Sequence, residues 1–203
     1  MDNIEKELEA GRAVILPTET VYGIFAKALD QEAVDYIYEL KRRPRDKALN
    51  LNVADEKTIR IYSKNQPSYL TKLIHSFLPG PLTIILQANE KVPNWIHSGL
   101  DTVGFRIPAH PKTLDLIRKY GPLVGPSANL SGHASGTKYR AIVSEFDQVV
   151  PGIEDDDFLT GQDSTILDIS SSKARILRQG SITKADLLAQ VPELSFEEDE
   201  LPQ

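Results

Sequence analysis

The sequence contains no cysteine among its 203 residues. This absence excludes a disulfide-stapled scaffold, a thiol nucleophile and a thiolate metal site, and it is typical of a cytoplasmic protein. No stretch approaches the roughly 20 consecutive apolar residues that a membrane-spanning helix needs. The first six residues, MDNIEK, are polar and acidic. We therefore expect neither a secretory signal peptide nor an association with a membrane.

Several common catalytic motifs are also absent. The chain has no GxGxxG dinucleotide fingerprint and no GxxxxGK motif followed by serine or threonine. Its four histidines lack the spacing of a metal site. Ser127 stands in GPSAN and not in the GxSxG of a serine hydrolase. These absences disfavour Rossmann-type enzymes, P-loop enzymes and serine hydrolases.

The net charge of −6 comes mostly from the C-terminal end. Residues 193–203 hold five acids and no base, which leaves 24 of the 29 acids against 23 bases in the rest of the chain. The body is therefore nearly neutral. We predict one domain over residues 1–190, and an acidic, disordered tail over residues 191–203 because this tail has little to bury.

Helical and strand patterns alternate along the chain. Helices are expected at 31–42, 55–62, 68–78, 111–120, 138–146 and 184–190. Strands are expected at 13–16, 49–53, 82–87, 102–107, 164–169 and 174–177. Asp30 can cap the first of these helices, and Pro111 occupies a favoured place in the first turn of another. Because no regular βαβ repeat is present, we predict a single α/β (mixed α+β) domain with a twisted mixed sheet flanked by helices.

Two segments place polar groups where folding has little use for them. The first, PTETVYG at 17–23, follows a buried strand directly, so its hydroxyls, carboxylate and phenol can point into a cleft. The second is a basic run at 41–47 that holds five cations. Five cations are more than the C-terminal end of a helix needs for capping. Arginine side chains can bind phosphate oxygens in pairs and lysine supplies a compact positive charge, so the run suits a polyphosphate ligand.

Two further segments carry candidate site residues. Ser127 and Asn129 are two apart, so in an extended conformation both side chains face the same way. Thr102, Gly104 and Arg106 fall on one face of a predicted strand whose other face is apolar. A charged side chain in the middle of a strand needs a carboxylate or phosphate partner, so Arg106 is a better site candidate than most residues.

Seven segments occur in a characteristic order: PTETVYG, KRRPRDKALNL, LPGPLT, TVGFRIPAH, PSANLSG, STILD and ILRQGSIT. Together they resemble the YrdC-type domain of the threonylcarbamoyl-AMP synthase family, from about Gly11 to Thr183. The resemblance implies a YrdC-like fold with a concave, positively charged cleft. Because the chain ends at Gln203, it is similar to the short, single-domain form of the family.

The resemblance also implies an activity. Members of the family condense L-threonine, bicarbonate and ATP to threonylcarbamoyl-AMP and pyrophosphate, and so act as nucleotidyltransferases. The product is used for threonylcarbamoylation of adenosine 37 in tRNAs that read ANN codons, by downstream tRNA threonylcarbamoyltransferase proteins. Mg²⁺ is expected to arrive with ATP and not in a dedicated protein site.

By resemblance, each candidate residue takes a role. The catalytic set is Lys41, Arg43, Ser127 and Asn129. The residues expected to bind threonine and bicarbonate are Thr20, Tyr22, Asn52, Arg106, Ser127 and Ser164. The residues expected to bind ATP are Lys41, Arg43, Lys47, Thr102, Asn129, Thr137 and Arg178. Lys47 and Asn52 depart from the asparagine and histidine of many relatives, and Asn52 leaves one threonine contact open.

Two other functions stay open at this point. One is a non-catalytic protein that binds double-stranded RNA or tRNA, although the nearly neutral body disfavours a general RNA binder. The other is a paralogue with the same fold and a different acceptor in place of threonine. The intact Lys-x-Arg and Ser-x-Asn patterns favour catalysis.

Overall fold

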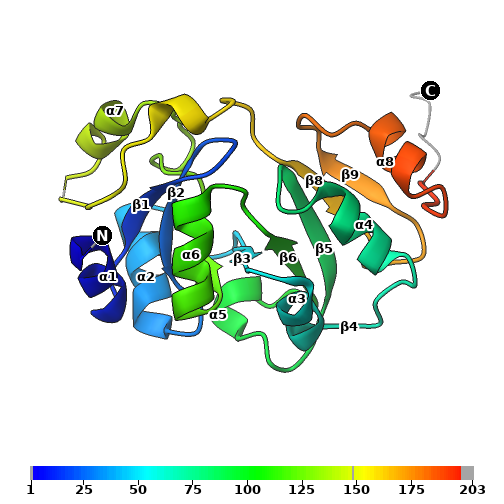
Figure 1. The fold of residues 1–203 in the computed structure, drawn as a ribbon. Coiled ribbons are helices and arrows are strands. Elements are labelled where there is room, and N and C mark those ends of the chain that lie inside the picture. Colours follow the sequence, from blue (N-terminus) through cyan, green and yellow to red (C-terminus); the bar gives the residue numbers. More distant parts are fainter. Residues whose placement is uncertain (1, 148, 198–203) are drawn as a thin grey trace.

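A computed structural model describes residues 2–147 and 149–197 of the chain. Within these ranges, one open, mixed sheet has the strand order β1-β2-β7-β3-β6-β5-β8-β9, with β4 paired to β5 (Figure 1). The strands are β1 (Val14–Pro17), β2 (Tyr22–Lys27), β3 (Leu51–Asn52), β4 (Ser63–Lys64), β5 (Leu82–Ala88), β6 (Thr102–Arg106), β7 (Leu123–Val124), β8 (Thr165–Asp168) and β9 (Arg175–Arg178). The predicted mixed sheet is confirmed.

Helices surround this sheet. They are α1 (Asp2–Glu9), α2 (Gln31–Leu40), α3 (Glu56–Tyr62), α4 (Leu70–Phe77), α5 (Asn94–His97), α6 (Pro111–Tyr120), α7 (Tyr139–Ser144), the 3₁₀ helix η1 (Asp156–Phe158) and α8 (Lys184–Gln190). Helix α1 packs on β1 and α2 on β2, whereas α4 packs on α8 near the other edge of the sheet (Figure 1). The side chain of Asp30 accepts from the Ala33 N–H and caps α2, as predicted.

None of the helices found in residues 2–147 and 149–197 combines the length and the apolar character required to cross a bilayer.

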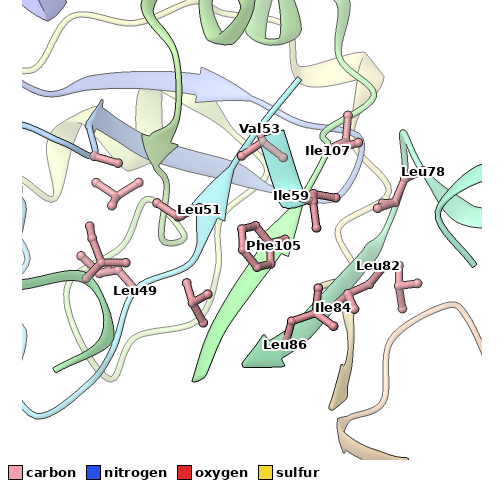
Figure 2. Close-up of a cluster of buried hydrophobic side chains, with 14 of the residues drawn as sticks. Leu49, Leu51, Val53, Ile59, Leu78, Leu82, Ile84, Leu86, Phe105 and Ile107 are labelled. Carbon is pink, nitrogen blue, oxygen red and sulfur yellow. The ribbon is translucent and has the colours of Figure 1, made fainter. Parts of the chain in front are cut away.

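The middle of the sheet pairs strands in both directions. Strand β6 runs parallel to β3 and antiparallel to β5, so Phe105 has Leu51 on one side and Ile84 on the other. Figure 2 shows Phe105 surrounded by the aliphatic side chains of these neighbouring elements. Val103, Phe105 and Ile107 are all buried, which confirms the predicted apolar face of this strand. The alternation leaves Arg106 on the opposite face.

A second core cluster lies at the β1 end of the sheet. Helix α1 buries Ile4 and Leu8 there, against Val14, Leu16 and Phe25 among others. The polar composition of the N-terminus concealed this helix, because within residues 3–9 only Ile4 and Leu8 are buried. Apolar side chains four positions apart lie on one face of a helix, which explains how so short a segment packs.

The prediction of a disordered tail from residue 191 is wrong for residues 191–197. Val191 and Leu194 are buried. The Ala174 N–H donates to Ser195 O (2.7 Å), and the Glu197 N–H donates to Ala174 O (3.1 Å), so this segment begins to pair beside β9. The prediction relied on the number of acidic residues and overlooked the apolar Val191 and Leu194 beside them. Residues 198–203 lie outside the described residues.

Shortening the side chain of Leu194 should therefore destabilise the protein. Leu194 is 5% exposed, and removal of a buried leucine side chain costs about 2–3 kcal/mol at the lower end of measured values. For a chain of this size we expect the Tm of Leu194→Ala to fall by roughly 4–10 °C. Val149→Ala is the control, since Val149 is 92% exposed and should leave the Tm nearly unchanged. Equal melting temperatures for both variants would contradict the packing of this segment.

Candidate active site

A cavity of about 280 Å³ lies where segments far apart in the sequence meet. Its lining residues are Thr18, Val21, Tyr22, Gly23, Arg43, Ala48, Asn50, Asn52, Thr83, Arg106, Gly125, Pro126, Ser127, Asp163, Ser164, Ile166 and Arg178. Hydroxyl, amide and guanidinium groups outnumber apolar side chains in this lining, so the cavity suits a small polar ligand with negative charge.

The connection between β1 and β2 is shaped by Thr18. Its Oγ1 donates to Val21 O (2.7 Å) and accepts from the backbone N–H groups of Thr20 (3.2 Å) and Val21 (3.3 Å). Such side-chain to backbone bonds fix a turn without a helix or strand. They place Thr20 Oγ1 2.7 Å from Arg106 Nη2. The loop therefore presents its hydroxyl groups to the end of β6.

Arg106, the last residue of β6, lies between this loop and the cavity. Its Nη2 donates to Glu19 Oε1 (2.6 Å) and to Thr20 Oγ1 (2.7 Å), and both members of the Arg106–Glu19 ion pair are largely buried. Its Nε is buried without a partner, and its Nη1 makes no hydrogen bond within the described part of the chain. Buried N–H groups normally have an acceptor, so this guanidinium is incompletely satisfied.

Tyr22 forms part of the cavity wall, but its hydroxyl is engaged elsewhere. The hydroxyl donates to Asp156 Oδ1 (2.9 Å) and accepts from the Asp155 N–H (2.8 Å). Burial is the main cause that raises the pKa of this phenol above its ordinary value. The tyrosine thus fastens the 155–156 segment over β2 and remains protonated at neutral pH.

The C-terminal end of α2 turns one arginine toward the cavity and another toward solvent. The Arg42 N–H donates to Glu39 O and the Arg43 N–H to Tyr38 O, with Arg42 at φ 51°. This pattern is a Schellman turn, in which the left-handed position is usually glycine. The helix predicted to reach residue 42 therefore ends two residues earlier. Arg42 is 71% exposed and pairs with Asp147, whereas Arg43 lines the cavity.

The guanidinium of Arg43 is held by the turn that follows it. Its Nη2 donates to Ala48 O (2.9 Å) and its Nε to Lys47 O (3.3 Å). The same Lys47 carbonyl accepts from the Tyr38 hydroxyl (2.7 Å). The Lys47 side chain itself is exposed and does not line the cavity. Backbone acceptors thus fix the position of the arginine before any ligand binds.

Lys41 is 2% exposed, which is unusual for a lysine. Its ammonium group donates to two carbonyl oxygens, those of Ser127 and Asn129. Burial, followed by the positive charge of Arg43, lowers the pKa of Lys41 to about 7, and the charge of Glu145 acts in the opposite direction. Lys41 therefore fastens the 127–129 loop to the end of α2 and does not itself line the cavity.

The 125–129 loop brings Ser127 to the cavity but turns Asn129 away. The Ala128 N–H donates to Tyr22 O (2.8 Å), which holds the loop against β2. The Asn129 N–H then donates to Ser127 O (3.0 Å), a tight turn over three residues. The Asn129 amide donates to backbone carbonyls of its own loop, including His133 O (2.9 Å). The prediction that Ser127 and Asn129 face the same way is wrong, because this turn ends the extended conformation.

Arg178 and Ser164 belong to the C-terminal part of the chain and also line the cavity. Arg178 donates from Nε to Ser164 O (2.9 Å) and from Nη2 to Ser164 Oγ (3.0 Å). Ser164 Oγ also lies 3.0 Å from Thr83 Oγ1, and Arg178 Nη1 lies 3.7 Å from Asp163 Oδ2. Gly180 permits this packing, since a Cβ there would collide with the backbone of residues 163–165. The arginine is thus preorganised next to two hydroxyl groups.

Comparison with known proteins places the chain in a family. A family model for Sua5, YciO and YrdC, described as telomere recombination, matches residues 6–180. The chain belongs to the Sua5/YciO/YrdC family.

Individual members of this family are similar over most of the chain. Threonylcarbamoyl-AMP synthase of Pyrococcus abyssi is 38% identical over 177 residues, which are 86% of this chain and 52% of that protein. Threonylcarbamoyl-AMP synthase of Bacillus subtilis is 38% identical over 185 residues, which are 90% of this chain and 54% of that protein. The chain therefore spans about half the length of these two relatives.

A solved structure from the Sua5/YciO/YrdC family shares this fold closely. The crystal structure of P. abyssi Sua5 complexed with L-threonine has a TM-score of 0.87 and 36% sequence identity to this chain. The match covers 95% of this chain and 57% of that one.

The cavity of this Sua5/YciO/YrdC protein gathers seven of the residues predicted from the sequence: Tyr22, Arg43, Asn52, Arg106, Ser127, Ser164 and Arg178. Thr20 and Lys41 lie just behind the lining, bonded to Arg106 and to the Ser127 carbonyl respectively. Asn52 is buried, and its amide donates to Leu123 O (3.4 Å).

Besides Thr20 and Lys41, four predicted residues do not line the cavity: Lys47, Thr102, Asn129 and Thr137. Thr102 pairs with Gln87 at the end of β6 opposite to Arg106, about 13 Å away along an extended strand. Thr137 lies in the loop before α7.

Some residues that the structure brings to the site received no individual role from the sequence. Thr18, Asn50, Thr83 and Asp163 line the cavity, and Glu19 holds Arg106. Thr83 carried a signal, because a hydroxyl interrupts the apolar run of β5. Glu19 stood within the PTETVYG segment, but its partner lies 87 residues away and no local pattern reveals it.

Proposed function

We propose that this protein is an ATP-dependent L-threonylcarbamoyl-AMP synthase, a nucleotidyltransferase that condenses L-threonine, bicarbonate and ATP. The names of the P. abyssi and B. subtilis relatives support this function, as does the similarity to a structure complexed with L-threonine. The product would supply downstream threonylcarbamoyltransferase proteins that modify adenosine 37 of tRNAs. The proposal covers the activity of the described domain.

The observation that carries the proposal is the state of Arg106. Its guanidinium lines the cavity with Nη2 already bonded and Nε buried, while Nη1 finds no acceptor in the part of the chain that the structure describes. The carboxylate of an amino acid would supply the missing acceptor through a charge-assisted hydrogen bond. The hydroxyl groups of Ser127 and Ser164, which also line the cavity, would bind the polar atoms of threonine or bicarbonate.

Two other arginines suit the nucleotide. Arg43 and Arg178 line the cavity, and each is fixed by hydrogen bonds to oxygen atoms of the chain. Preorganised cations stabilise negative charge that develops on a leaving phosphate without any reorganisation of solvent. Lys47 lies in the same turn as Arg43, with an exposed ammonium that a triphosphate could reach. We leave Thr102, Asn129 and Thr137 out of the proposed contacts because they do not face the cavity.

The proposed reaction needs no covalent intermediate on the protein. The amino group of threonine adds to bicarbonate, and loss of water gives a carbamate. A carbamate oxygen then forms a bond to the α-phosphorus of ATP, and the bond between that phosphorus and the bridging oxygen breaks to release pyrophosphate. The protein therefore has to hold three anions together and neutralise their charge, which is catalysis by positioning and electrostatics.

The donor set of the cavity fits magnesium that arrives bound to ATP. Residues 2–147 and 149–197 contain no group of three or more acidic or histidine side chains able to hold a metal ion. Asp163 is the one carboxylate among the lining residues. Mg²⁺ commonly binds through one or two carboxylates together with substrate phosphates and water, so Asp163 is the side chain that would contact it. Bound magnesium would neutralise part of the phosphate charge.

Pyrophosphate release should require every proposed substrate. We expect release only when ATP, Mg²⁺, threonine and bicarbonate are all present, and none when threonine or bicarbonate is omitted from a degassed reaction. Serine should react more slowly by roughly 10- to 100-fold, because a pocket gains about 1–3 kcal/mol from one methyl group. Mass spectrometry of the product identifies the adenylate. Release at the full rate without threonine would contradict the proposed function.

A further inference from the structure

Glu19 has the contacts of a residue that holds another residue in place. Its Oε1 accepts from Arg106 Nη2 (2.6 Å), and its Oε2 accepts from the backbone N–H of Ala109 (2.9 Å). Its own carbonyl oxygen accepts from the Thr160 N–H (3.0 Å). The Glu19 side chain is largely buried and does not line the cavity. The carboxylate is thus fixed from two sides, and Nη2 is the nitrogen through which Arg106 contacts it.

The contacts with Arg106 and Ala109 require that both carboxylate oxygens of Glu19 act as acceptors. A carboxylate accepts through both oxygens, whereas an amide of the same shape accepts through one and donates through the other. In Glu19→Gln, one of the two N–H donors would face an NH₂ group. The carboxylate also compensates the charge of Arg106, which is buried next to it.

The geometry points to Glu19 as the positioning residue of the amino-acid subsite. It holds Nη2 of Arg106 together with Thr20, and so directs Nη1, which has no partner among the described residues, to the carboxylate of the bound amino acid. This inference rests on the proposed function for the identity of the ligand. The inference concerns the recognition of threonine and not the chemistry at the α-phosphorus. Loss of the Glu19 carboxylate should therefore change the KM for threonine and not the KM for ATP.

Steady-state kinetics of Glu19→Gln provides the first test. We expect the KM for threonine to rise at least about 10-fold, since a hydrogen bond to a charged group is lost. The kcat should fall by less than about threefold and the KM for ATP should stay unchanged. Glu19→Asp keeps two charged acceptors on a shorter stem and should recover part of the threonine affinity. An unchanged KM for threonine, or a lower one, would overturn the inference.

Glu56→Gln is the matched control. Glu56 also accepts from an arginine, Arg60 (2.7 Å), and from a second donor, the Thr71 hydroxyl (2.6 Å). It lies on α3 and does not line the cavity. Its loss should leave the KM for threonine unchanged. A rise equal to that of Glu19→Gln would mean that any lost ion pair has this effect, and would overturn the inference.

A second readout does not depend on turnover. Side-chain N–H signals of Arg106 in ¹⁵N-labelled protein can be assigned from their absence in Arg106→Lys. We expect these signals to be protected from exchange in the parent protein and lost or broadened in Glu19→Gln, with the backbone spectrum otherwise retained. Protected signals in both proteins would overturn the inference. If the parent shows this protection but releases no threonine-dependent pyrophosphate, the proposed function fails and the positioning by Glu19 stands.

Discussion

Replacement of Arg43 by alanine should lower the rate of pyrophosphate release by about 10²–10³-fold, the usual effect of removing a preorganised group that stabilises developing charge. Arg43 lines the cavity, and backbone carbonyls of Lys47 and Ala48 hold its guanidinium. Arg43→Lys should also be impaired, because lysine keeps the charge but lacks the planar fork that binds phosphate oxygens in pairs.

Arg42→Ala is the matched control for this experiment. Arg42 is the neighbouring cation, but the Schellman turn directs it to solvent, where it pairs with Asp147. Exposed ion pairs contribute about 0–1 kcal/mol, so its loss should leave both turnover and Tm nearly unchanged. The Tm of Arg43→Ala is measured in parallel, so that loss of binding is separated from loss of folding. Near-parental turnover of a folded Arg43→Ala would contradict this prediction and would mean that Arg43 has only a structural role.

The free energy of unfolding of the parent protein should rise between pH 7.5 and 9.5 by about 2–3 kcal/mol more than that of Lys41→Met. Burial lowers the pKa of Lys41 from 10.5 to about 7 in the folded protein. Between these two values the unfolded chain binds more protons than the folded chain, so stability rises with pH. Below pH 7 the cost of the buried charge is fully present, and it disappears as the pH approaches 10.5.

Denaturant titrations of both proteins at the two pH values measure this difference. Lys47→Met is the control, because Lys47 lies in the same turn with an exposed side chain and should keep the parental pH dependence. Equal pH dependence of the parent and Lys41→Met would show that the carbonyl oxygens of Ser127 and Asn129 keep the ammonium charged over this range. It would contradict a lowered pKa.

Patterns carried by neighbouring residues predicted much of this fold. The alternation in TVGFRIP predicted both the buried face of β6 and the position of Arg106 on the opposite face, because side chains of a strand alternate with period two. Asp30 and Pro111 predicted the starts of α2 and α6 by the ordinary rules for helix N-termini. The family resemblance added the order of the segments and is confirmed by the comparisons.

Three features of the site could not be predicted in this way. The end of α2 follows from the left-handed backbone of Arg42, a position that normally requires glycine. Asn129 turns away from the cavity because of a tight turn in its own loop. The burial of Lys41 depends on carbonyls 86 and 88 residues away. The first two outcomes depend on local turns that these residue types do not signal, and the third depends on tertiary contacts, which local propensity does not encode.

The cavity draws on residues from Thr18 to Arg178. During synthesis the N-terminal strands emerge long before β8 and β9, and domains tend to fold in the order in which they appear. A nascent chain that lacks β9 has no Arg178 to hold Ser164, and therefore no complete site. Contacts between residues so far apart in sequence also form late, since long loops must close first. The ribosome must therefore complete synthesis through Arg178 before the whole lining of this cavity can assemble.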